Sequence, residues 1–234
     1  MPLDYILRII AQFGLIWRRI VRFKDHRDAE AGLAEIDAAY GKLFGYNAGF
    51  IDLLPDEELV ALARDGDALD PDRAGVLAAL HSAEGDFYTM QGRIDEAFRR
   101  YERAALLYGA IMRSGQSLSR ELREPAAELA ATLELYVLDP PMLDDLWRIY
   151  AALDRYADAE NVLWNWLEQV AFDPACVADA LRWYADLLKL PDRMLAAGNL
   201  PRAEVQHSIG QLEANPGYRV PDADGNIPGS KRQN

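Results

Sequence analysis

The stretch ALHSAEGDFYTMQGRIDEAFRRYERAALLY, Ala79 to Tyr108, decides the fold, because its small and large side chains recur at helical spacing. It predicts two antiparallel helices joined by a tight turn at Gly92. Small residues let the two helices approach closely, and tyrosines fill the space beside them. The residues assigned to this packing are Gly85, Tyr88, Gly92, Ala97, Tyr101 and Ala104.

The same stretch resembles the tetratricopeptide repeat (TPR), in which a Trp-x-x-Leu-Gly-x-x-Tyr helix is followed by an Ala-x-x-x-Phe helix. Here the pattern reads His81-x-x-Glu84-Gly85-x-x-Tyr88 and then Ala97-x-x-x-Tyr101. The resemblance covers about one repeat, and two positions that are apolar in the family hold His81 and Glu84. It implies an all-α fold, a right-handed α-solenoid of TPR-like helical hairpins that acts as a protein-binding scaffold.

Weaker half-repeats flank this hairpin. Ala31 lies 66 residues before Ala97 and Ala159 lies 62 residues after it, each close to two units of the roughly 34-residue period. Residues 142–153 and 157–170 predict a second, degenerate hairpin. The opening DYILRIIAQFG also resembles a group of uncharacterised bacterial TPR-type proteins, which implies the fold and no activity.

Residues 3–23 predict an amphipathic helix, with apolar side chains on one broad side and arginines on the other. Burying its nine large apolar side chains contributes on the order of 15 to 25 kcal/mol at most, so this face needs a cover. We expect the helix to pack on the repeats as a capping element. The alternative is a peripheral membrane adaptor anchored by residues 3–23, because a basic face opposite Trp17 and Phe13 is typical of membrane-surface helices.

The chain is therefore expected to have three parts. Residues 1–24 form the amphipathic N-terminal helix packed on the repeats, and residues 25–214 form the TPR-like helical repeat domain. Residues 215–234, with three prolines and three glycines, predict a disordered tail.

Charge narrows the classes of partner. The net charge is −13, and residues 1–24 carry five basic side chains against one acidic, so the remainder is even more acidic. Such a body repels phosphate backbones, and we expect no nucleic-acid partner. Basic protein segments suit it better. The single cysteine, Cys176, excludes an internal disulfide, and no secretory signal is recognisable, so the expected location is the cytoplasm.

Catalytic chemistry is not indicated. The sequence contains no Gly-rich phosphate loop, no zinc-binding HExxH helix and no nucleophile elbow, so we expect no enzyme and no cofactor, with a helical-fold enzyme as the third reading. No metal site is expected either, because capping and turn chemistry explains the aspartates of residues 65–72. His81 is expected to be a packed side chain. Glu84 is expected to reach an arginine or to line a groove.

If the repeat resemblance holds, the ligand groove is built from the first helix of each hairpin. The candidate partner groove then comprises Ser82, Asp86, Thr89, Met90, Asp144, Asp145 and Arg148. This set is acidic on balance, so we predict that it selects a basic or amphipathic helical segment of a protein partner. The competing interpretation is that these are ordinary exposed helix residues. The oligomeric state is not indicated.

Overall fold

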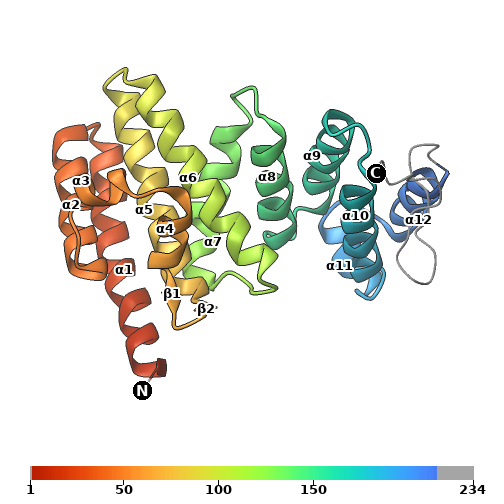
Figure 1. Ribbon diagram of the computed structural model, residues 1–234, viewed down its shortest axis with the longest axis horizontal. Helices are drawn as coiled ribbons and strands as arrows, with labels where there is room; N and C mark the ends of the chain where they lie inside the picture. The colour runs from red at the N-terminus through yellow and green to blue at the C-terminus, as the bar shows by residue number, and fades with distance from the viewer. Residues whose placement is uncertain (1, 215–234) are drawn as a thin grey trace, which may run out of the picture. The chain divides into compact units, whose positions relative to one another are not determined.

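The computed structural model describes residues 2–214, with side chains from residue 9 onward, and over this range the fold is all-α with almost no strand (Figure 1). Twelve helices and one short two-stranded ladder make up the described residues. The chain divides after Leu153 into two compact units, a boundary that no Gly- or Pro-rich linker marks in the sequence. The predicted disordered tail, residues 215–234, lies outside the described residues.

The elements of the first unit are α1 (Pro2–Asp25), α2 (Ala29–Phe44), α3 (Ala48–Leu53), α4 (Asp56–Leu62), β1 (Arg64–Asp65), β2 (Ala68–Leu69), α5 (Pro71–Met90), α6 (Ile94–Arg113), α7 (Arg120–Leu133) and α8 (Pro140–Ala152). Those of the second unit are α9 (Tyr156–Gln169), α10 (Pro174–Leu187), α11 (Asp192–Ala197) and α12 (Arg202–Glu213).

The predicted hairpin is α5 and α6. Gly92 turns the chain between them with φ +74°, a conformation that glycine adopts without strain. The helices are in close contact at Gly85, where a Cβ atom would lie only 2.5 Å from the ring of Tyr101. Ala97 and Ala104 are fully buried at the same interface. Close approach therefore explains the small residues of this hairpin.

Helix α1 packs against α2 and α5. The described apolar side chains of its inner face are buried, among them Phe13, Ile16 and Ile20, whereas Arg18 and Arg19 are exposed. At its end, the Nζ atom of Lys24 lies 2.6 Å from Asp86 on α5 and 2.9 Å from Glu128 on α7. One basic side chain thus joins three helices.

Helices α7 and α8 continue the unit. Helix α7 packs on α5 and α6, and α8 packs chiefly on α6 and also on α7. The boundary between the two units falls between α8 and α9, the two helices of the second predicted hairpin, and that hairpin stays a prediction. Pro125 lies inside α7, five residues after the helix begins at Arg120.

A short connection leads from α4 to α5. Arg64 pairs with Leu69 and Asp65 with Ala68 in the β1–β2 ladder, which the sequence did not indicate. Asp70 then caps α5, because its carboxylate accepts hydrogen bonds from the backbone N–H groups of the second and third residues that follow. Within this acidic stretch, Asp70 is thus the N-cap of α5 and Asp65 belongs to the ladder.

In the second unit, one polar network joins three helices. Glu160 on α9 accepts hydrogen bonds from Tyr184 on α10 (2.8 Å) and from Ser208 on α12 (2.7 Å). Trp164 donates to the same tyrosine oxygen at 3.1 Å. Burial is the main cause that raises the pKa of Tyr184, and the neighbouring Glu160 carboxylate adds to it. The hydroxyl therefore stays protonated and remains a donor.

Candidate functional site

The α5 residues of the predicted groove lie near α1. Ser82 is buried, and Asp86 accepts a hydrogen bond from the hydroxyl of Tyr101 at 2.9 Å in addition to its ion pair with Lys24. Thr89 is exposed, with its hydroxyl 3.2 Å from that of Tyr101, and Met90 is half-buried. The carboxylate of this set is therefore engaged within the chain.

The acidic α8 residues of the predicted groove contact α6. Asp144 and Asp145 both form ion pairs with Arg113 of α6, at 3.0 and 2.6 Å. Arg148 in turn donates to Asp144 at 3.0 Å. Burial raises the pKa of Asp145 to about 6, partly offset by Arg113. The single groove shared with the α5 set stays a prediction.

A buried polar cluster fills the interior next to the hairpin. Glu84 on α5 is almost fully buried, and its carboxylate lies 2.9 Å from the Nε atom of Arg100 on α6. The hydroxyls of Tyr40 and Tyr88 each donate to it at 3.4 Å. Burial raises the pKa of Glu84 to about 7, and Arg100 opposes that rise. Of the two expectations for Glu84, the structure shows contact with an arginine.

His81 belongs to the same interior. It is buried with neither ring nitrogen hydrogen-bonded, and its ring centroid lies 5.7 Å from that of Tyr40. Burial lowers the pKa of His81 to about 3, and the guanidinium groups of Arg100 and Arg103 add to that shift. The imidazole is therefore neutral at physiological pH and acts as a packed ring.

Two arginines of α6 form hydrogen bonds and ion pairs with the α3–α4 segment. Arg100 donates to the Asp52 carboxylate on α3, and Arg103 donates to the backbone carbonyls of Ile51 and Leu54. Hydrogen bonding to Arg100 is the main cause that lowers the pKa of Asp52. Arg103 also lies 3.6 Å from Asp56 at the start of α4. Both guanidinium groups are thus committed to the chain itself.

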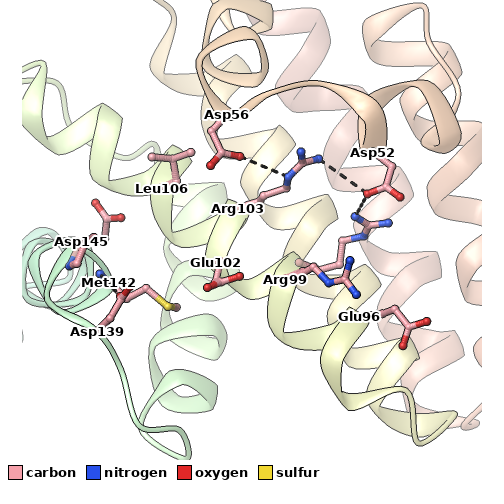
Figure 2. Close-up of a pocket in the computed structure, with 12 residues that line it drawn as sticks. Asp52, Asp56, Glu96, Arg99, Glu102, Arg103, Leu106, Asp139, Met142 and Asp145 are labelled. Carbon is pink, nitrogen blue, oxygen red and sulfur yellow. Dashed lines mark hydrogen bonds and ion pairs between the residues drawn. The ribbon is translucent and has the colours of Figure 1, made fainter.

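A pocket of about 520 Å³ lies beside these arginines (Figure 2). Figure 2 shows Asp52 and Asp56 on one side of α6 and Asp139, Met142 and Asp145 on the other. The lining residues are Asp52, Asp56, Glu96, Arg99, Arg100, Glu102, Arg103, Leu106, Asp139, Pro141, Met142 and Asp145. Six carboxylates thus face three guanidinium groups, which makes the pocket acidic.

Glu102 is the pocket carboxylate with the least compensation. It lies half-buried on α6, and no hydrogen bond or ion pair to it is found in the described structure. Burial raises the pKa of Glu102, the carboxylates of Asp139 and Asp56 raise it further, and the guanidinium of Arg99 opposes that rise. A bound cation relieves such repulsion. The pocket therefore suits a basic group.

Three further features of the described residues concern metal ligands, the lining of the pocket and the length of the apolar helices. Within the described residues, no group of three or more His, Cys, Asp or Glu side chains is placed to hold a metal ion. The pocket is lined by Arg100 but by neither Glu84 nor His81. In residues 2–214, no helix combines the length and apolarity that crossing a membrane requires.

The sequence did not predict this pocket, although Asp145 belongs both to the predicted groove and to the pocket lining. The available signal was the spacing of Glu96, Arg99 or Arg100, Arg103 and Leu106, which places them on one face of α6 away from the packed alanines.

Comparison with known proteins gives a family. The model described as "Family of unknown function (DUF6483)" matches residues 2–217, so the chain belongs to that family. No curated protein matches the chain, and no solved structure matches it. Membership in this family names no activity. The resemblance to TPR proteins therefore remains an interpretation of the hairpin residues.

Proposed function

We propose that this protein is a non-catalytic interaction scaffold that binds a basic segment of a partner protein in the pocket beside α6. The scaffold is a right-handed α-solenoid of TPR-like hairpins, located in the cytoplasm. The single observation that carries the proposal is the charge of the pocket, with six carboxylates and three guanidinium groups.

The repeat interpretation is supported by helix pairing in the first unit. Helices α5 and α6 form a close antiparallel pair, and α1 with α2 and α7 with α8 also pack as neighbours in sequence. Helix α5 contacts α1 and α7, while α6 contacts α8. Such pairing is what stacked helical hairpins produce. The amphipathic α1 then serves as the first helix of the stack.

The preference for a basic partner is supported by how the arginines are used. Arg100 and Arg103 are occupied by Asp52 and by backbone carbonyls, so they attract an incoming anion weakly. Glu102 forms no hydrogen bond or ion pair within the described residues, and only the charge of Arg99 partly offsets that of its neighbouring carboxylates. Charge complementarity of this kind speeds encounter with the partner and excludes acidic competitors.

The alternative function, a peripheral membrane adaptor, needs the apolar face of α1, and the described residues of that face are buried. Ile9, Phe13, Ile16 and Ile20 are all buried within the first unit. Trp17 is 7% exposed, and Lys24 lies over its ring with Nζ 5.0 Å from the centroid. A helix that binds a membrane surface must present this face to lipid. Such binding would therefore require α1 to leave α2 and α5.

The test uses the full chain and two fluorescein-labelled peptides, one rich in Lys and Arg and the other with Glu in those places. Fluorescence anisotropy should show saturable binding of the basic peptide only, weakening as salt is added. Glu102→Lys should reduce the affinity by about tenfold, equivalent to ~1.4 kcal/mol.

The matched control is Glu213→Lys, which makes the same charge change at an exposed position in the last turn of α12. It should leave the affinity for the basic peptide close to that of the wild type. Equal weakening by Glu213→Lys and Glu102→Lys would show that only overall charge matters. Equal binding of the acidic peptide would also contradict the proposal.

A further inference from the structure

Three aliphatic side chains of the first unit are almost fully exposed. Leu53 at the end of α3 is 84% exposed, and Leu135 and Val137 between α7 and α8 are 83% and 99% exposed. Isolated exposed leucines are ordinary, but all three belong to segments that contribute to one charged pocket.

Each of them is close in sequence to a residue that lines that pocket. Leu53 lies between Asp52, which lines the pocket, and Leu54, whose carbonyl accepts a hydrogen bond from Arg103. The other two residues flank Tyr136, whose ring packs on Phe98 of α6 with the centroids 5.0 Å apart.

Asp139 follows Val137 by two residues and lines the pocket from the side opposite Asp52 (Figure 2). Apolar side chains therefore lie on both segments that border the acidic pocket. A ligand carrying charge alone leaves these aliphatic groups in water.

Resting on the proposed function, we infer that the partner segment binds as an amphipathic helix. Its apolar side chains lie on Leu53, Leu135 and Val137, and a basic side chain enters the pocket next to Glu102. A helix that presents apolar and basic groups at i, i+3 and i+4 provides both chemistries on one side.

A second copy of the chain fits this surface less well. The net charge of −13 opposes the approach of two copies. The chain's own basic amphipathic helix, α1, already buries its apolar face against α2 and α5. The occupant is therefore a segment of a different, basic protein.

Two basic peptides of identical composition separate this inference from the proposed function. In the first, Leu recurs at i, i+3 and i+4 among Lys and Ala; in the second, the same residues are scrambled so that no apolar face forms. Isothermal titration calorimetry with the full chain should show about tenfold tighter binding of the amphipathic peptide. Circular dichroism of that peptide should gain helical signal on binding.

The double variant Leu53→Ser, Val137→Ser should abolish this tenfold advantage and leave the affinity for the scrambled peptide unchanged. Leu15→Ser, at a 54% exposed position on α1 outside the pocket lining, is the control and should keep the advantage. Because the substituted side chains are exposed, thermal unfolding should be nearly unchanged.

The outcomes are distinguishable. If neither peptide binds, the proposed function fails. If both bind with equal affinity, or if the advantage survives the double variant, the inference fails while the proposed function stands. Sedimentation velocity tests self-association. If the wild type is a dimer and the double variant is a monomer, the surface is an interface between copies of the chain, and the inference is overturned.

Discussion

The Nε atom of Arg100 lies 2.9 Å from a carboxylate oxygen of Glu84, at a depth where both side chains are nine-tenths or more buried. The same guanidinium donates to Asp52 on the outer side of α6. One side chain, Arg100, therefore contacts both the interior of the α5–α6 hairpin, through Glu84, and helix α3, through Asp52.

Replacing Arg100 should be costly because it strands a buried carboxylate. Arg100→Met should lower the free energy of unfolding by about 3 to 5 kcal/mol at pH 8. At pH 5 the loss should be smaller, since Glu84, with a pKa of about 7, is then protonated. Urea unfolding at the two pH values measures this. Arg99→Met, at an exposed position one residue earlier, is the control and should change stability by less than ~0.5 kcal/mol.

Glu84 should make stability fall as pH rises. Its pKa of about 7 lies above the ordinary value of 4.5, so the folded chain holds this proton more tightly than the unfolded chain does. The stabilisation is complete below pH 4.5 and is lost as the pH approaches 7, a change on the order of 3 kcal/mol. Glu84→Gln should remove this pH-dependent part of the free energy of unfolding. The stability of the variant relative to the wild type should therefore increase as the pH rises from 4.5 to 7. Exposed Glu213→Gln should keep the wild-type slope, and a parallel slope for Glu84→Gln would contradict the assignment.

His81 should be replaceable by an apolar ring with a gain in stability. Neither of its buried nitrogens is hydrogen-bonded, so His81→Phe removes two unsatisfied polar atoms while keeping a ring beside Tyr40. An increase of about 1 to 2 kcal/mol in the free energy of unfolding is expected at pH 7. The gain should grow as pH falls below 6.5, because the depressed pKa of His81 makes the wild type lose stability there. Chemical denaturation checks both points, and exposed His207→Phe should show no such gain.

Gly85 should tolerate no side chain. Its Cβ in Gly85→Ala would lie 2.5 Å from the Tyr101 ring, and such overpacking typically costs about 1 to 3 kcal/mol. The control is Gly14→Ala in α1, where nothing lies within 4 Å of the added atom; it should stabilise by ~0.5 to 1 kcal/mol through helix propensity. In the background Tyr101→Leu, the penalty at position 85 should shrink. If both alanine variants have the same effect in thermal unfolding, this account of the hairpin is wrong.

The hairpin could be predicted because its determinants are local. Gly85, Gly92 and Tyr101 fall within seventeen residues, and their spacing alone specifies two helices in close contact. The pocket could not be predicted in the same way. It depends on Arg100 meeting Asp52, a pair 48 residues apart, and hydrophobic periodicity carries no information on such a pair.

The helices that α8 contacts could not be predicted from sequence periodicity either. An apolar stripe identifies which face of a helix is buried but not which neighbour buries it. The repeat resemblance predicts Asp144 and Asp145 on a groove shared with α5, and this groove stays a prediction. The ion pairs of both residues with Arg113 of α6 could not be predicted from hydrophobic periodicity. Burial of the α1 face, in contrast, followed from its large apolar area, whichever helix covers it.

The packing of α1 on α5 also affects how the chain is made. Synthesis of the roughly 65 residues between Asp25 and Met90 takes ~3 to 13 s at ordinary ribosome speed. Throughout that interval the apolar face of α1 is not yet covered by α5. The nascent chain therefore exposes an apolar segment that chaperones can bind until α5 has been synthesised.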